Sequence, residues 1–191
     1  VGAFGSLDIS GDIDVDGTTN LDVVDIDGAV DMASTLQVDG AITSSAGATI
    51  TTADNSDNLT LTSTDADASV GPNLNLYRNS SSPADNDIAG LIKFQSRNDN
   101  SQDVTYSEMY ITTPDVSDGS EDGQLHIDTM VAGTSRSRIK LMPAETVFNE
   151  NSIDLDFRVE SDGNENMLFV DGGNNRVGVG TSSPSNLFHI K

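Results

Sequence analysis

The chain contains no cysteine and no tryptophan among its 191 residues, and only three Tyr and six Phe. Without cysteine there is no disulfide, no thiolate metal site and no cysteine nucleophile. The apolar fraction is 35%, whereas globular domains contain roughly 45–50% when glycine is included. We therefore expect several small modules, or a core shared between subunits, rather than one large hydrophobic core.

Positive charge is also missing from the first part of the chain. No Lys or Arg precedes Arg78, residues 1–77 contain thirteen Asp and no Glu, and the whole chain has a formal charge of −22. A field of this sign repels nucleic-acid phosphates and anionic membranes. The longest apolar runs, such as residues 167–170, span four residues, far fewer than a membrane crossing needs. We expect neither nucleic-acid binding nor membrane insertion.

Residues 7–40 contain a short acidic repeat. The unit Val/Ile-Asp-Gly recurs at residues 15–17, 26–28 and 38–40, with spacings of 11 and 12 residues. Apolar and acidic residues alternate between the glycines, so an extended strand would carry Asp on one side and aliphatic residues on the other. The aliphatic side comprises Leu7, Ile9, Ile13, Val15, Val23, Ile26 and Val38. Repeats this short become stable only by stacking on other copies. The pattern predicts a self-associating β-repeat, with disorder of residues 1–40 as the alternative.

Helix patterns are nearly absent and strand patterns recur throughout, which predicts an all-β fold. We divide the chain into four parts: an Asp-rich β-repeat shaft (1–45), a Ser/Thr/Asp-rich thin shaft or linker (46–70), an antiparallel β module (71–148) and a β-meander (149–191). The strands expected after residue 45 are 58–62, 73–78, 89–97, 104–113, 125–131, 136–142, 155–160, 167–171, 176–179 and 187–190.

One hairpin is expected around Ala132-Gly133-Thr134, because a three-residue loop containing Gly suits a bulged hairpin turn. Its register pairs Leu125 with Leu141, Ile127 with Ile139, His126 with Lys140 and Asp128 with Arg138. The basic run of Arg136, Arg138 and Lys140 has two interpretations, a patch for a polyanion or a solvated strand face that pairs with nearby Asp. We favour the solvated face.

Metal-binding patterns are incomplete. Residues 12–17 match the first half of an EF-hand loop, but Val23 stands where the bidentate Glu is required and no helices flank the loop. A looser calcium site remains open if Asp16, Asp27 and Asp39 of several chains converge near an axis. We otherwise expect no cofactor and assign no metal-binding or cofactor-binding residue.

Catalytic patterns are equally weak. The two histidines, His126 and His189, lie in no recognisable Ser/His/Asp context, and His126 falls on the strand face expected to be solvated. The glycine-rich stretch 172–180 has neither the spacing nor the following helix of a phosphate-binding loop. We assign no catalytic residue and expect no enzymatic activity.

Residues 170–191, VDGGNNRVGVGTSSPSNLFHIK, contain a glycine-rich hairpin, a Val-Gly-Thr-Ser-Ser-Pro turn and a short Leu-x-x-Ile strand. This box resembles the segment that precedes the endosialidase-type intramolecular chaperone of bacteriophage tail fibres and tail spikes. Residues 76–139 resemble a module of marine phage fibres, and the Asp-rich repeats resemble their shafts.

The resemblance implies a homotrimer with a shaft of intertwined β-strands, located extracellularly in the virion tail fibre. The implied partners are copies of the chain itself, other virion proteins and a host surface receptor. It also implies a chaperone domain after Lys191, so we expect the chain to be a fragment or processed piece of a longer protein. A depolymerase tailspike and a cellular surface adhesin or filament subunit are the alternative functions.

Overall fold

The computed structural model describes residues 24, 26, 27 and 29–191 of the chain, which falls into two units, Val1–Thr60 and Leu61–Lys191. The expected strand residues Leu7, Ile9, Ile13, Val15 and Val23, and the EF-hand-like residues 12–17, lie outside the described residues. All nine strands of the described part belong to the second unit, and none of the described residues is helical. The prediction of an all-β fold is confirmed.

The described residues of the first unit form no strand and are exposed. The contacts there are local and polar: the side-chain amide of Asn58 donates to the carbonyl of Ile50 at 2.9 Å, and the amide of Ser56 donates to Oδ1 of Asp54 at 2.9 Å. The strand expected over residues 58–62 is wrong for the single chain, because no second strand pairs with it and an unpaired strand is not stable in water.

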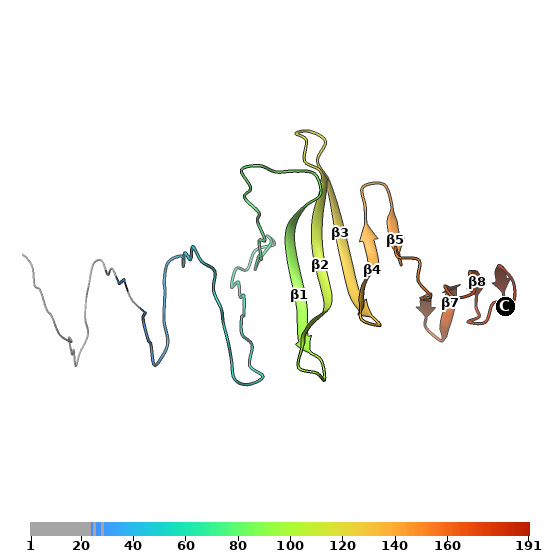
Figure 1. The fold of residues 1–191 in the computed structure, drawn as a ribbon, viewed down its shortest axis with the longest axis horizontal. Coiled ribbons are helices and arrows are strands. Elements are labelled where there is room, and N and C mark those ends of the chain that lie inside the picture. The colour runs from blue at the N-terminus through green and yellow to red at the C-terminus, as the bar shows by residue number, and fades with distance from the viewer. Residues whose placement is uncertain (1–23, 25, 28) are drawn as a thin grey trace, which may run out of the picture. The chain divides into compact units, whose positions relative to one another are not determined.

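Five antiparallel strands form the first sheet, in the order β1-β2-β3-β4-β5 (Figure 1). They are β1 (Asp87–Arg97), β2 (Asp103–Asp115), β3 (Asp122–Val131), β4 (Thr134–Leu141) and β5 (Thr146–Phe148). Each strand follows its neighbour along the chain, so every connection is a hairpin. The turn between β1 and β2 is fixed by Asn98, whose Oδ1 accepts hydrogen bonds from the amides of Asn100 and Gln102 at 3.0 and 2.9 Å.

The hairpin of β3 and β4 differs in one detail from its prediction. The pairs Leu125–Leu141, Ile127–Ile139 and His126–Lys140 are confirmed. The pair Asp128–Arg138 is wrong, because Asp128 lies opposite Ser137 and Arg138 forms a bulge. The loop itself has two residues, Ala132 and Gly133, with φ of 47° and 78°.

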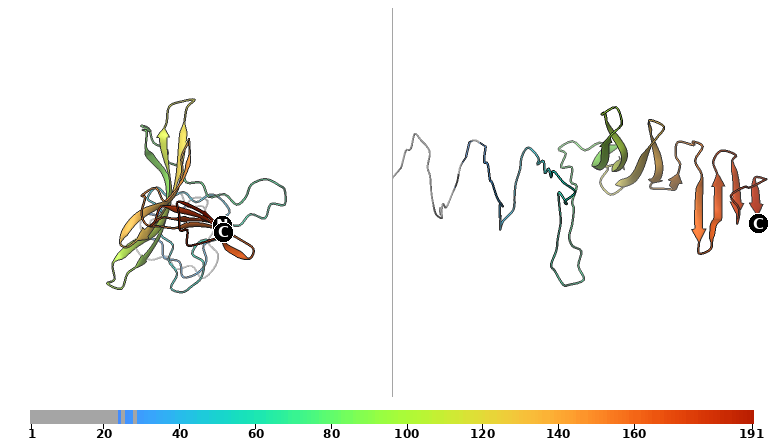
Figure 2. Two further views of the ribbon diagram at one scale, coloured as in Figure 1. Left: turned by 90° about the vertical axis from the view of Figure 1, so that its right-hand side faces the viewer. Right: turned by 90° about the horizontal axis from the view of Figure 1, so that it is seen from below.

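The second sheet contains β6 (Phe157–Ser161), β7 (Asn164–Asp171), β8 (Arg176–Val179) and β9 (Phe188–Ile190), in that order (Figure 2). The first three strands form the expected meander, and β9 adds to β8 in parallel. Left-handed residues close both turns of the meander, Gly163 at φ 80° and Asn175 at φ 54°. In the second turn Asp171 accepts hydrogen bonds from Asn174, which lower the pKa of its carboxyl.

The strand expected over residues 73–78 is also wrong. The segment carries no strand hydrogen bonds and is held to β1 by side chains instead. Arg78 forms an ion pair with Asp87 at 3.0 Å, and its guanidinium donates to the carbonyl of Ile88 at 3.2 Å. The guanidinium thus takes a carbonyl that a neighbouring strand would use.

Candidate functional site

The first sheet is amphipathic, and its apolar face is open to solvent in the single chain. Two rows of side chains cross the strands on this face, and neither row carries a charge. One row comprises Ile92, Met109, Ile127, Ile139 and Phe148, one residue from each strand. The next row comprises Gly90, Ile111, Leu125, Leu141 and Thr146.

Glycine at position 90 shapes this face. A Cβ at Gly90 would lie 3.0 Å from Cβ of Leu76, so the missing side chain lets Leu76 lie against the sheet. A groove of about 340 Å³ remains beside it, lined by apolar side chains. The lining side chains that favour a hydrophobic occupant are Leu76, Ile92, Met109, Ile111 and Leu125.

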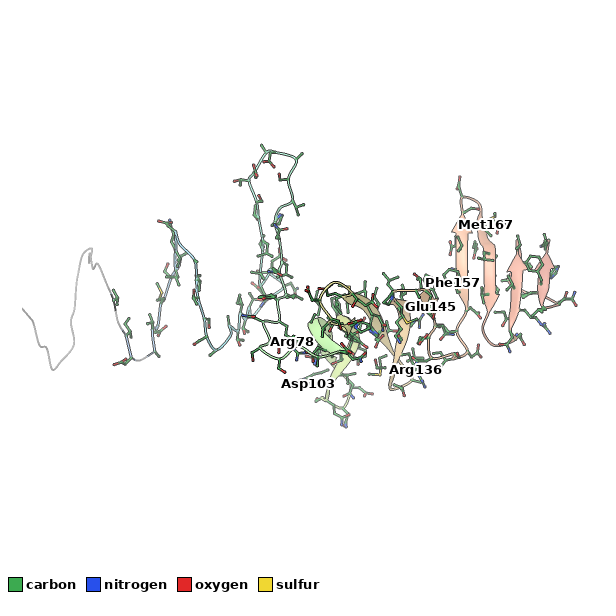
Figure 3. All side chains as sticks on the ribbon, turned by 90° about the horizontal axis from the view of Figure 1, so that it is seen from above. Arg78, Asp103, Arg136, Glu145, Phe157 and Met167 are labelled. Atoms are coloured by element: carbon green, nitrogen blue, oxygen red, sulfur yellow. The ribbon has the colours of Figure 1, made fainter. Side chains whose placement is uncertain are left out.

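The second sheet also has one apolar face, and it is smaller than that of the first sheet. Its register places eight apolar residues on one face and no charged residue among them. They are Phe157, Val159, Leu168, Val170, Val177, Val179, Phe188 and Ile190. Phe157 begins β6 (Figure 3), and its ring lies 4.9 Å from that of Phe148 in the first sheet. We call the two rows of the first sheet, together with these eight residues, the apolar strip.

The turn of residues 181–184 packs against the opposite face of the second sheet. Phe169, 8% exposed, is the one buried hydrophobic side chain in the described part of the chain. Beside it in the register is Gly178, where a Cβ would overlap the carbonyl oxygen of Thr181. Arg176 donates to the carbonyl of Pro184 at 2.9 Å, and Pro184 is buried. The Gly-Thr-Ser-Ser-Pro turn therefore folds back onto this face.

The polar face of the first sheet is less solvated than expected. His126 and Asp128 are only 7% and 9% exposed, so the prediction that His126 lies on a solvated face is wrong. The imidazole stacks on the ring of Tyr110 with centroids 4.3 Å apart and an angle of 10° between the planes. Longer side chains of the flanking strands and the stacked ring cover positions that alternation alone assigns to solvent.

Hydrogen bonds and charges around His126 favour its neutral form. Its Nε2 lies 2.7 Å from Nε2 of Gln124, which donates to an unprotonated ring nitrogen, and 3.1 Å from Oγ1 of Thr112. Burial, followed by the nearby Lys140, lowers the pKa of His126. Burial and the neighbouring Asp128 raise the pKa of Tyr110, whose hydroxyl donates to Oδ2 of Asp128 at 3.3 Å.

The basic run does not form one patch. Arg136 lies opposite Thr129, on the side of the apolar rows, whereas Lys140 lies opposite His126 on the polar face. The bulge at Arg138 changes the alternation between them. Lys140 pairs with Glu150 at 3.3 Å rather than with an Asp of the facing strand. Neither the polyanion patch nor the Asp-paired face describes this arrangement, since the bases are divided between two faces.

The remaining candidate residues are dispersed. Asp27 and Asp39 are exposed, and Asp16 lies outside the described residues. Within the described part, no three His, Asp or Glu side chains gather in a way suited to a metal ion. His189 on β9 accepts a hydrogen bond from the amide of Ser185 at 3.3 Å. In the same part of the chain no helix has the length and apolarity of a membrane span.

After residue 45, the sequence pattern was assigned opposite faces only in the hairpin of residues 125–142, so the apolar strip was not predicted. Its signal was present in the alternation of Ile92 with Phe94 and of Met109 with Ile111. The contact between Phe148 and Phe157, which joins the two apolar faces, is not visible in any local pattern. No protein-family model, curated protein or solved structure matches the chain.

Proposed function

We propose that this chain is a structural segment of a homotrimeric bacteriophage tail fibre that contributes to virion structure and host attachment. One observation supports association of chains: the described part of the chain buries a single hydrophobic side chain, Phe169. The number of three copies comes from the resemblance to phage fibres. Folded strands that leave their apolar faces in water favour a core shared between chains.

The energetics agree with a shared core. Each aliphatic or aromatic side chain that passes from full exposure to full burial contributes roughly 1.5–3 kcal/mol, and the apolar strip offers many such residues at partial exposure. Repulsion between copies that each carry a charge of −22 opposes association, but salt screens charges that face solvent. The role in a phage fibre rests on the resemblance of residues 170–191 and of the Asp-rich repeats.

Light scattering after gel filtration of residues 1–191 tests the trimer. We expect a native mass of about 60 kDa, three times the chain mass of 20.0 kDa. A folded species of about 20 kDa would contradict it. Electron microscopy of particles labelled with gold-conjugated antibody against this chain tests the location, and label confined to the fibres is the expected result.

The proposal assigns the chain no catalytic step. An incubation with the surface polysaccharide of the host should therefore release no reducing ends above background. Saccharide release that depended on carboxylates of this chain would instead favour a depolymerase tailspike.

A further inference from the structure

The apolar strip is continuous across the two sheets. Its two halves meet where Phe148 and Phe157 lie with ring centroids 4.9 Å apart. Beside this contact lies a hollow of about 270 Å³, lined by Ile139 and Leu155 and, at its polar side, by Arg138, Asn149 and Asp156. A single partner surface can therefore cover residues of both sheets.

The charge distribution identifies what can cover this strip. The two central rows of the first sheet and the eight residues of the second carry no charge, although the chain as a whole carries −22. On the reverse face of the first sheet, Lys93, Glu108 and Asp128 follow one another across three strands, and Lys140 lies opposite His126 in the neighbouring row. Two copies that meet through the strip leave these charged faces outside the contact. Contact through the reverse face would desolvate them.

The open groove beside Leu76 supports the same occupant. It is an apolar recess on a face that also presents exposed large side chains, among them Phe94 and Phe148. A second copy brings both the recess and the protruding side chains to the contact, which an interface between identical chains requires.

We propose that the apolar strip is the interface between copies of this chain, with the face of Tyr110, His126 and Asp128 turned away from the contact. This inference rests on the proposed function, because it locates the contact through which the trimer forms. It assigns assembly to residues 90–148 and 157–190, in addition to the Asp-rich repeat.

A matched pair of substitutions on neighbouring strands tests which face is used. Ile111 in β2 lies on the apolar strip and is 37% exposed, and Leu91 in β1 lies on the reverse face and is 38% exposed. We expect Ile111→Asp to reduce the native mass of the full chain from about 60 to about 20 kDa, while Leu91→Asp keeps the wild-type mass. Equal masses for the two variants would overturn the inference.

A second measurement detects the contact between copies directly, without a substitution meant to break it. The chain has no cysteine, so Met109→Cys and Leu91→Cys each offer one site for a pyrene maleimide. The excimer emission of stacked pyrenes is expected for the label at position 109 and is expected to be absent at position 91. Excimer emission at position 91 alone would show that the reverse face is the interface.

The two proposals fail in different ways. A wild-type chain of about 20 kDa would overturn both the trimer and the interface. A wild-type mass of about 60 kDa with Ile111→Asp unchanged and no excimer at position 109 would overturn the interface alone. A dimer with excimer emission at position 109 would support the interface and overturn the trimer.

Discussion

At the scale of single residues, His126 shows how alternation predicts a face but not its solvation. The sequence placed it correctly opposite Lys140 and on the side away from Ile127. It could not predict burial, because burial depends on the ring of Tyr110 and the hydroxyl of Thr112 from β2 and on the side chain of Gln124 from β3. These groups come from separate elements, and only the register between strands brings them together.

The lowered pKa of His126 predicts a loss of stability in acid. The folded state holds the imidazole neutral through burial and the neighbouring Lys140, against the opposing effects of Asp128 and Glu150. The unfolded chain therefore binds the proton more readily. The stabilising contribution is fully present above the ordinary imidazole pKa of 6.5, and it decreases as the pH falls from there towards the lower pKa of the folded state.

Urea unfolding of the wild type, His126→Gln and His189→Gln between pH 7.5 and pH 5 tests this prediction. His126→Gln should show a smaller decrease of unfolding free energy over this range than the wild type. His189→Gln, which changes the other histidine of the chain, separates the contribution of His126 from a general effect of replacing a histidine. An unchanged pH dependence in His126→Gln would contradict the assigned cause.

At the scale of elements, the hairpin of β3 and β4 marks the limit of register prediction. A three-residue loop and a two-residue loop followed by a bulge give the same pairs for Leu125 and Ile127. The sequence therefore predicted these pairs correctly and misplaced Arg138. The wrong strand prediction for residues 73–78 has a different cause, because a side-chain contact from Arg78 replaces strand pairing there.

The two-residue loop predicts that Ala132→Asn stabilises the hairpin. Ala132 has a φ of 47°, a conformation that costs L-residues about 1–2 kcal/mol. Asn tolerates it better, and Asn-Gly is the preferred sequence for loops in which both residues have positive φ. We expect the unfolding free energy to rise by about 0.5–1 kcal/mol at a fixed protein concentration.

Thermal unfolding followed by circular dichroism measures this effect. Ala144→Asn is the matched control, because Ala144 is exposed and lies outside the strands, and its φ is not among the positive values. The control should leave the midpoint unchanged. An equal rise in both variants would point to a general effect of Asn rather than to the turn.

At the scale of the molecule, the recurring strand patterns predicted the all-β fold, and composition predicted the lack of one large core. Phe169 alone is a buried hydrophobic residue within the described part, in line with the low apolar and aromatic content. The apolar strip was not predicted as a unit, because its halves come from two sheets and join through one contact between Phe148 and Phe157. Local periodicity carries no information on such contacts.

The uncharged interface and the charge of −22 together predict that salt strengthens assembly. Between about 0.01 M and 0.15 M NaCl the Debye length falls from about 30 Å to about 8 Å, which weakens repulsion between copies while apolar contacts persist. We expect the protein concentration at half-dissociation, measured by analytical ultracentrifugation, to fall as NaCl rises. An interface held by ion pairs would respond in the opposite direction.

Calcium and magnesium chlorides at matched ionic strength separate screening from binding, because only bound calcium at residues such as Asp27 and Asp39 would give calcium an effect beyond that of magnesium.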